Sequence, residues 1–287
     1  MIARPPQYSP LVWALMLALD VLPWPWGERI LAGVFVVKSF VQVSKLRGAL
    51  RWASARSAGR RDRWRLALAT CAHHGRAVAR SAIVGLRDPA TLLPFLVLRG
   101  EEHLRSASGG VILLGFHLGM PNNDVALRLM GHRVRWLGGR RIRGLWTRPA
   151  WQPYLDQRDD LVIVKGPGAR GGVLRRACRA LLDGETLYVT ADGAGREAFR
   201  VPLPGAPMVV RTGWVTLREH AGATVLPVLA HREGSSHVVT IHPPLPADLV
   251  ASAAALGRLL EEYARHFPEQ CYTLAFPRLR AASARAA

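Results

Sequence analysis

Short apolar runs alternate with helix-patterned segments from the middle of the chain onward. Five of these runs are mostly apolar, carry β-branched or aromatic residues and have the length of strands: 111–115, 133–137, 161–164, 186–190 and 224–230. Between several of them lie stretches with helical patterning, such as 124–130 and 172–182. Because strands that alternate with helices are typical of layered domains, we predict an α/β/α fold with a mixed central sheet.

The first part of the chain is apolar, but charged residues and prolines interrupt it. One apolar run covers residues 8–26 and a second covers 30–43. Asp20 and two prolines break the first run and Lys38 breaks the second, so neither is a clean bilayer span. No small-residue cleavage site follows to indicate a signal peptide. Tryptophans beside the prolines suit a helix or helical hairpin in the lipid headgroup zone, and ordinary core helices are the alternative.

The charge of the chain is strongly positive. Lys and Arg number 39 against 20 Asp and Glu, giving a formal net charge of +19, and only three of the 39 are lysines. Residues 45–65 carry eight basic residues against Asp62 alone. Directly after an apolar segment, such a run suits anionic lipid headgroups, although a solvated helix face has the same pattern. We therefore divide the chain into an N-terminal membrane-facing helical segment (1–65), an α/β domain (66–280) and a frayed tail (281–287).

The composition excludes several classes of protein. An apolar fraction of 49% is too high for a disordered chain, and three cysteines are too few for a disulfide scaffold. Cys71 stands beside His73 and His74, but no second ligand cluster follows at zinc spacing. We expect no metal site, and we interpret the cysteines as thiols in a reducing compartment.

The sequence predicts a candidate catalytic histidine at the end of the first strand. Residues 115–124 read Gly-Phe-His-Leu-Gly-Met-Pro-Asn-Asn-Asp, so that His117 follows the strand and Gly119 lets backbone approach a ligand. Open α/β sheets build their ligand sites at the carboxyl ends of strands. An imidazole at that edge can act as a general base if a carboxylate or an amide orients its second nitrogen.

The strand and the histidine that follows it resemble a motif of a known family. VILLGFHLG (111–119) resembles the strand and first motif of the glycerolipid acyltransferase superfamily, H-x4-D/E, in its bacterial lipid A late acyltransferase branch. Further matches follow in order over residues 100–280: LLDGETLYVTADGAG at 181–195, VPLPG at 201–205, the helix and strand ending in V-x-P-V within 207–228, and FPEQ at 267–270.

The resemblance implies an acyltransferase with an acyltransferase-like α/β/α domain. Acyl carrier protein or coenzyme A would supply a fatty acyl thioester as co-substrate, with no other cofactor. A hydroxyl or amine of a lipid or glycolipid, of the lipid A type, would accept the chain, and His117 would be the general base. The expected location is the cytoplasmic face of the inner membrane, with anionic membrane lipid as a further partner.

The chain departs from the family pattern at one position. Counted from His117, the acidic position of H-x4-D/E is Asn122, and the next acid is Asp124. Asn122 could orient the imidazole by hydrogen bonding, or Asp124 could turn back toward it. A non-catalytic lipid-binding relative that lost the acidic partner is the alternative.

Asp192 and Gly193, which follow the strand-like run 186–190, resemble the acidic-Gly motif of the superfamily. We expect them to contact substrate: the Asp192 carboxylate could accept from an acceptor hydroxyl, bind an arginine of the site or orient His117, and a plain Asp-Gly turn is the alternative.

Two further segments predict substrate contacts. Residues 164–172 read V-K-G-P-G-A-R-G-G before a helix that we expect to begin near Gly172. Free N–H groups of that helix, together with Arg170 and Gly171, would bind a phosphate of the acceptor or of the donor's pantetheine arm. A G-x-G-x-x-G dinucleotide turn paired with Glu185 and a plain surface loop are the alternatives.

The second segment is an arginine run between residues 128 and 148 that contains no acid, includes Arg141 and is interleaved with Trp136 and Trp146. No helix-turn-helix, zinc-ligand or RNA-recognition signature accompanies it, so we expect no specific nucleic acid partner. Anionic headgroups or an acidic carrier protein account for these arginines together with the apolar N-terminus.

Overall fold

The computed structural model describes residues 22–83, 87–139, 151, 154, 161–163, 169–192 and 198–276. The described helices are α2 (Trp24–Val41), α3 (Val43–Ser54), α4 (Arg60–Ile83), α5 (Glu101–Ser106), α6 (Asn123–Leu129), α7 (Ala169–Leu182), α8 (Gly213–Ala221), α9 (Leu249–His266) and α10 (Tyr272–Ala275), with 3₁₀ turns η1 (Pro89–Thr91), η2 (Leu93–Phe95) and η5 (Pro268–Gln270). The strands are β1 (Leu96–Arg99), β2 (Val111–Gly115), β3 (Arg135–Gly139), β4 (Leu161–Ile163), β5 (Thr186–Thr190), β6 (Ala198–Val201), β7 (Met208–Arg211), β8 (Thr224–Glu233) and β9 (Ser236–Ile241).

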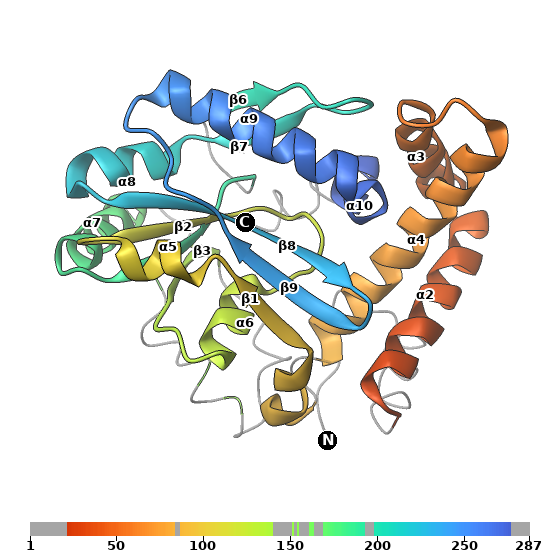
Figure 1. Ribbon diagram of the computed structural model, residues 1–287, viewed down its shortest axis with the longest axis horizontal. Helices are drawn as coiled ribbons and strands as arrows, with labels where there is room; N and C mark the ends of the chain where they lie inside the picture. Colours follow the sequence, from red (N-terminus) through yellow and green to blue (C-terminus); the bar gives the residue numbers. More distant parts are fainter. Residues whose placement is uncertain are drawn as a thin grey trace.

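A mixed sheet of seven strands forms the centre of the fold, as predicted (Figure 1). The strand order is β1-β9-β8-β2-β5-β3-β4, with β8 and β9 antiparallel and every other neighbouring pair parallel. Strand β2 lies between β5 and β8, and all five of its residues are buried. A separate antiparallel pair, β6 and β7, lies beside α9.

The side chains of β2 alternate between two hydrophobic cores, one on each face of the sheet. Ile112 and Leu114 belong to a core shared with residues of α3, α4, α7, α8, α9 and α10. Val111 and Leu113 point to the opposite face, where Leu127 of α6 packs with residues of β8 and β9. Because successive side chains of a strand point to opposite faces, a continuous apolar run such as this one must be covered on both sides. The layering is therefore α/β/α.

The predicted elements agree with the structure, with shifted ends. Strand β3 begins at Arg135 instead of 133, because Arg128 Nε donates to the Val134 carbonyl and occupies that backbone before the ladder starts. Strand β8 continues past residue 230 to Glu233, where it turns into β9. Helix α7 begins at Ala169, three residues before the expected start.

Three helices precede the sheet in the described chain. Pro23 is the N-cap of α2 and Pro25 lies in its first turn, where a missing N–H breaks no helical bond; the prolines therefore start this helix. Helices α2 and α3 pack against α4, which continues through residue 65 and connects the two expected segments. Among the described residues, no helix combines the length and the apolar character needed to cross a bilayer.

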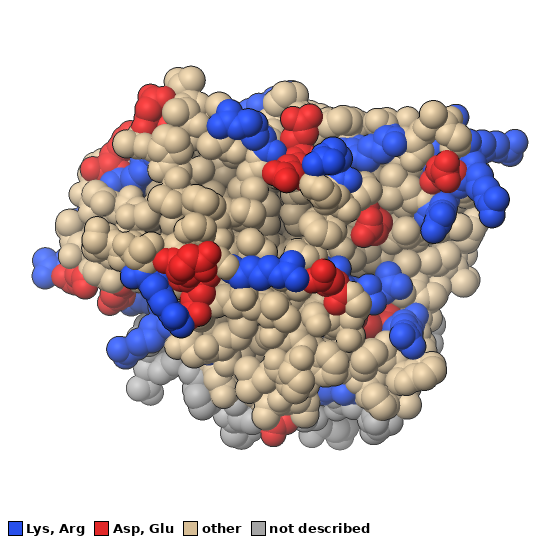
Figure 2. Space-filling model, viewed as in Figure 1, with Lys and Arg blue, Asp and Glu red and all other residues tan. Residues whose placement is uncertain are grey.

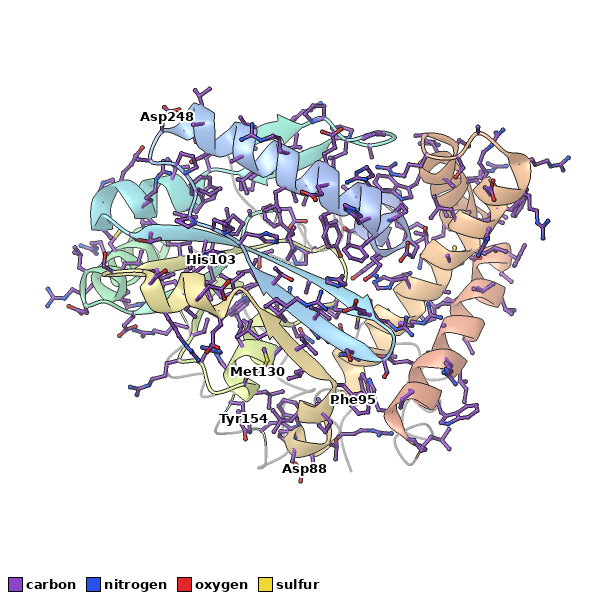
Figure 3. The ribbon with its side chains drawn as sticks, viewed as in Figure 1. Asp88, Phe95, His103, Met130, Tyr154 and Asp248 are labelled. Atoms are coloured by element: carbon purple, nitrogen blue, oxygen red, sulfur yellow. The ribbon has the colours of Figure 1, made fainter. Side chains whose placement is uncertain are left out.

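The C-terminal helices cover one side of the sheet. Helix α9 starts where the Asp248 carboxylate accepts from the Ala251 N–H at 2.7 Å, a standard N-cap (Figure 3). Its buried positions, including Leu256, Leu260 and Tyr263, recur at helical spacing and face the sheet. The short η5 and α10 then return the chain to the carboxyl end of β2.

Candidate active site

Strand register brings the two central polar side chains together. In the parallel β2–β5 pair, Gly115 is opposite Thr190, and the Ala191 N–H continues the ladder to the Gly115 carbonyl at 2.8 Å. His117 and Asp192 each follow two residues after the end of their strand. They therefore meet at the carboxyl edge of the sheet, as equal spacing past an in-register pair requires.

The carboxylate of Asp192 makes two hydrogen bonds to His117. Its Oδ1 lies 2.9 Å from the imidazole Nδ1 and 3.0 Å from the backbone N of the same residue. The Asp192 side chain is fully buried, whereas the His117 side chain is 57% exposed. Since an ionised carboxylate only accepts, Nδ1 carries the proton of a neutral ring and Nε2 keeps its lone pair. The geometry is that of an oriented imidazole on an accessible edge.

Backbone contacts fix the turn that carries His117. The Thr273 hydroxyl of α10 donates to the His117 carbonyl at 2.6 Å, and the Gly119 N–H donates to the Gln270 carbonyl at 3.0 Å. Gly119 has φ +64°, and a Cβ there would overlap the Ala230 carbonyl. Only glycine fits both the backbone angle and the space.

The Phe267–Gln270 segment clamps this turn to β8. The Gln270 amide accepts from the Arg232 N–H at 2.7 Å and donates to the Arg232 carbonyl at 3.0 Å, as a further strand would. The Trp52 indole of α3 donates to the Pro268 carbonyl at 2.8 Å. Sequence reasoning noted this segment only by family resemblance; the structure shows that it holds the His117 turn.

Asn122 and Asp124, the other two candidates for orienting the imidazole, lie at the start of α6. Asn122 is the N-cap residue, with φ 61°, and its Nδ2 is buried without a hydrogen-bond partner among the described residues. Asp124 lies in the first turn and is buried. Asn123 between them accepts from His237 Nε2 at 2.9 Å and donates to the Tyr188 hydroxyl at 3.4 Å. The catalytic roles expected of Asn122 and Asp124 stay predictions.

The expected substrate contacts are only partly described. Arg170 and Gly171 lie in the first turn of α7, since that helix starts at Ala169, and not in a turn preceding it. Glu185, considered above for a ribose, instead pairs with Arg135 at 2.6 Å. Arg141 and Gly193 lie outside the described residues.

Two buried histidines of α4 lie against this region, and sequence reasoning weighed them only as metal ligands. His73 Nε2 is 3.0 Å from the Gly119 carbonyl, and His74 stacks on Tyr272. Burial lowers the pKa of His73 to about 4 and that of His74 to about 3, so both rings are neutral near pH 7. No group of three or more potential metal-ligating side chains occurs in the described part of the chain.

A cavity of about 540 Å³ lies at the opposite, amino-terminal edge of the sheet. Its lining includes His103 of α5, labelled in Figure 3, with Arg218 and Glu219 of α8 and Thr224, the first residue of β8. Because Thr224 pairs with Val111 at the start of β2, this cavity is separated from His117 by the length of that strand. It is not part of the histidine site.

The comparison with protein families agrees with the resemblance drawn from the motifs. A family model described as bacterial lipid A biosynthesis acyltransferase matches residues 4–281. A search of curated proteins found no match. Among solved structures, the crystal structure of the 1-acyl-sn-glycerophosphate (LPA) acyltransferase PlsC from Thermotoga maritima is similar, with 15% identity and a TM-score of 0.42 over 83% of this chain and 93% of that chain.

Proposed function

Since the chain belongs to the bacterial lipid A biosynthesis acyltransferase family, and so is an enzyme that transfers acyl groups, we propose that it acylates a lipid or glycolipid with His117 as general base. The observation that carries this proposal is the 2.9 Å contact between His117 Nδ1 and the buried Asp192, with the rest of the ring exposed. Family membership gives the acyl transfer. The geometry of the site supports the roles that we propose for His117 and Asp192.

In this mechanism Nε2 of His117 removes the proton from a hydroxyl or amine of the acceptor. The oxygen or nitrogen attacks the carbonyl carbon of an acyl thioester, and the tetrahedral intermediate collapses with cleavage of the C–S bond. The thiolate then takes the proton from the imidazolium. Asp192 holds the ring in the Nδ1–H tautomer and stabilises its positive charge while the proton is on Nε2. No acyl-enzyme is formed.

Asp192 replaces the carboxylate that Asn122 lacks. A side chain that only hydrogen bonds can orient an imidazole, but a carboxylate also stabilises the imidazolium by charge. The contact with His117 therefore favours catalysis over a lipid-binding relative that has lost its acidic partner. Burial of the Asp192 carboxylate is tolerated because the Nδ1–H and the backbone N–H of His117 both donate to it.

Charge supports the donor and the acceptor that we propose. Basic side chains spread over the face shown in Figure 2 and gather over α3 and the start of α4. A net charge of +19 attracts the acidic acyl carrier protein, the phosphates of coenzyme A and anionic headgroups alike. An acyl thioester as donor and a lipid A type glycolipid as acceptor fit this charge and the family.

We place the enzyme on the cytoplasmic face of the inner membrane, held by α2. The exposed large apolar side chains of this helix are Trp26, Ile30, Val37, Phe40 and Val41. At 100° per residue they fall within an arc of about 100°, opposite the face that packs on α4. An exposed apolar stripe with cations beside it is typical of a helix lying in a membrane interface.

The membrane contact is tested by flotation with vesicles of phosphatidylglycerol and phosphatidylethanolamine. Replacing Val37 and Phe40 by Glu should weaken binding by about tenfold or more for each side chain. Leu174→Glu, an exposed apolar position on α7, is the matched control and should bind as wild type does. Equal binding of all variants would contradict the role of α2.

The reaction is tested with purified protein, acyl-acyl carrier protein or acyl-coenzyme A, and isolated lipid acceptors. Thiol release should depend on the acceptor, and mass spectrometry should show the acceptor heavier by one acyl group. His220 of α8 is also an exposed histidine, so His220→Ala is the matched control for His117→Ala and should react as wild type does. Thiol release that is equal without acceptor, or the absence of an acylated product with every lipid, would contradict the proposal.

A further inference from the structure

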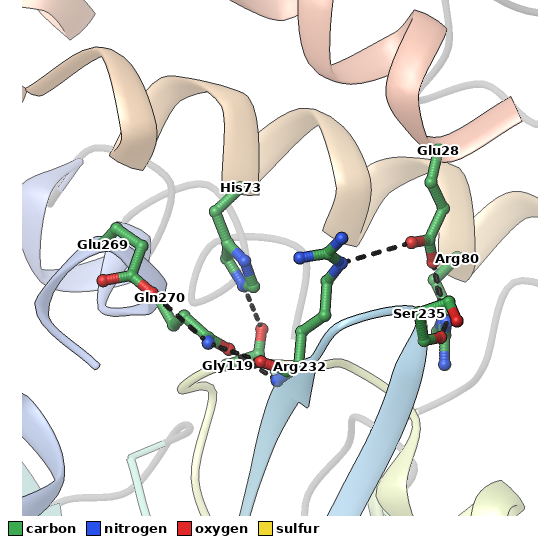
Figure 4. A network of polar contacts seen from close by, with 8 residues as sticks. All are labelled: Glu28, His73, Arg80, Gly119, Arg232, Ser235, Glu269 and Gln270. Carbon is green, nitrogen blue, oxygen red and sulfur yellow. Dashed lines mark hydrogen bonds and ion pairs between the residues drawn. The ribbon is translucent and has the colours of Figure 1, made fainter. Parts of the chain in front are cut away.

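His73 reaches the catalytic turn from the N-terminal helices. It comes from the middle of α4, is 2% exposed, and its Nε2 lies 3.0 Å from the Gly119 carbonyl, two residues after His117 (Figure 4). A carbonyl only accepts, so Nε2 carries the proton of the neutral ring. The imidazole therefore donates to the turn, and the contact fixes its tautomer.

Four hydrogen bonds hold the turn at alternate residues. His117 donates its N–H to Asp192 and accepts at its carbonyl from Thr273. Gly119 donates its N–H to the Gln270 carbonyl and accepts from His73. Asp192 follows a strand of the sheet and two partners belong to the C-terminal turns, whereas His73 comes from α4, one of the helices that precede the sheet. Without it, the Gly119 carbonyl would be a buried acceptor that has lost its donor.

The helix that carries His73 is held on both sides. Arg80, two turns further along α4, pairs with Glu28 of α2 at 2.7 Å, and both side chains are buried. The second oxygen of Glu28 lies 3.6 Å from Arg232 Nε on β8, whose backbone is paired by Gln270. Figure 4 shows these contacts as one network running from α2 through α4 to β8 and η5. These contacts hold α4, and with it the imidazole of His73, in a fixed position relative to β8.

We propose that His73 is a positioning residue for acyl transfer: its Nε2–H holds the Gly119 carbonyl so that the His117 ring meets Asp192. The proposal rests on the proposed function and adds to it that the N-terminal helices complete the catalytic site. His73 touches neither reacting atom. It acts through the turn that carries His117. Its loss should still lower the rate, because even a small displacement of a catalytic group has a strong effect on catalysis.

The adjacent His74 provides a matched control. It is 7% exposed on the same helix and is surrounded by aromatic rings, Phe35, Tyr272 and Phe276. No hydrogen bond of its ring occurs among the described residues. Loss of this ring removes a buried imidazole from α4 and leaves the Gly119 carbonyl with its donor.

The experiment compares His73→Leu, His73→Gln and His74→Leu in the full-length protein. His73→Leu should lower kcat by about 10- to 100-fold with KM nearly unchanged. Gln places an N–H donor at nearly the reach of Nε2, and His73→Gln should recover kcat to within about fivefold of wild type. His74→Leu should stay within about threefold. A kcat for His73→Leu equal to that of His74→Leu, or no recovery with Gln, overturns the proposal.

A second measurement separates this proposal from the function on which it rests. In protein with ¹⁵N-labelled histidine, the His117 ring should show the Nδ1–H tautomer in wild type, His73→Gln and His74→Leu, and a tautomer mixture in His73→Leu. An unchanged His117 tautomer in folded His73→Leu overturns the role of His73 even if no acyl transfer is found. Absence of acyl transfer in wild type with the tautomer change present overturns only the proposed function.

Discussion

Asp192→Asn and Asp192→Ala separate the two proposed contributions of the Asp192 carboxylate, which are to hold the tautomer of His117 and to stabilise the positive charge of its imidazolium. The backbone N–H of His117 donates to Oδ1, so an asparagine at this position must turn its oxygen toward that N–H and its amide nitrogen away. The same oxygen then still accepts from Nδ1–H. Asn therefore keeps the tautomer and removes the charge, whereas Ala removes both.

The magnitudes follow from the site. At about 4 Å, a carboxylate stabilises an imidazolium by roughly 1 kcal/mol in water and roughly 4 kcal/mol at a dielectric of 20. Because the carboxylate is buried and the ring is 57% exposed, we take about 2 kcal/mol, or a ~30-fold loss of kcat for Asn. Ala also frees the ring and removes the acceptor of the His117 N–H, at about 2 kcal/mol more, for a ~10³-fold loss in total.

Acceptor-dependent thiol release under saturating donor measures both variants, and thermal unfolding verifies that both are folded. The expected order of kcat is wild type, then Asn, then Ala. Asn as damaging as Ala would refute the argument that the backbone N–H sets the amide orientation. Ala within a few-fold of wild type would refute the role of Asp192 altogether.

Three further predictions concern stability. Gly119→Ala should destabilise by about 3 kcal/mol or more in denaturant titration, because its Cβ overlaps the Ala230 carbonyl at positive φ; a loss below 1 kcal/mol would contradict the packing. Burial lowers the pKa of His74 from 6.5 to about 3, so the folded state binds fewer protons between those values and stability falls as pH decreases from 6.5. When the pH falls from 6.5 to 5, the free energy of unfolding of His74→Leu should therefore decrease by about 1–2 kcal/mol less than that of wild type, and equal decreases would refute this. Glu28→Gln should cost about 3–5 kcal/mol in chemical unfolding, since it leaves Arg80 charged and buried, and a neutral effect would contradict a buried ion pair.

The sheet could be predicted from the sequence because its central strands are short apolar runs. Strand β2 is buried on both faces, and its five residues coincide with the predicted strand. Strands β1 and β9 are less evident in sequence, since β1 reads LVLR and the start of β9 reads SHVV, with polar residues among the apolar ones. Their place in the sheet depends on pairing between residues about 140 positions apart, such as Leu96 with His237, which local patterning does not carry.

The site could be predicted only where chemistry follows directly from a strand end. His117 is predictable because it follows a continuous apolar strand, and Asp192 because it follows a second strand and resembles the acidic-Gly motif of the superfamily. Their contact could have been inferred from equal spacing after the two strands, a signal that needs the register of β2 and β5. His73 could not be found this way. It lies on a helix 46 residues before Gly119, and its role comes from packing between layers.

The central claim is that the imidazole of His117 removes the acceptor's proton, and the rate of acceptor-dependent thiol release by His117→Ala tests it most directly. The account predicts a rate lower than wild type by about 10²- to 10⁴-fold in a protein that unfolds at the wild-type temperature. A folded His117→Ala protein that transfers acyl groups within threefold of the wild-type rate would contradict it.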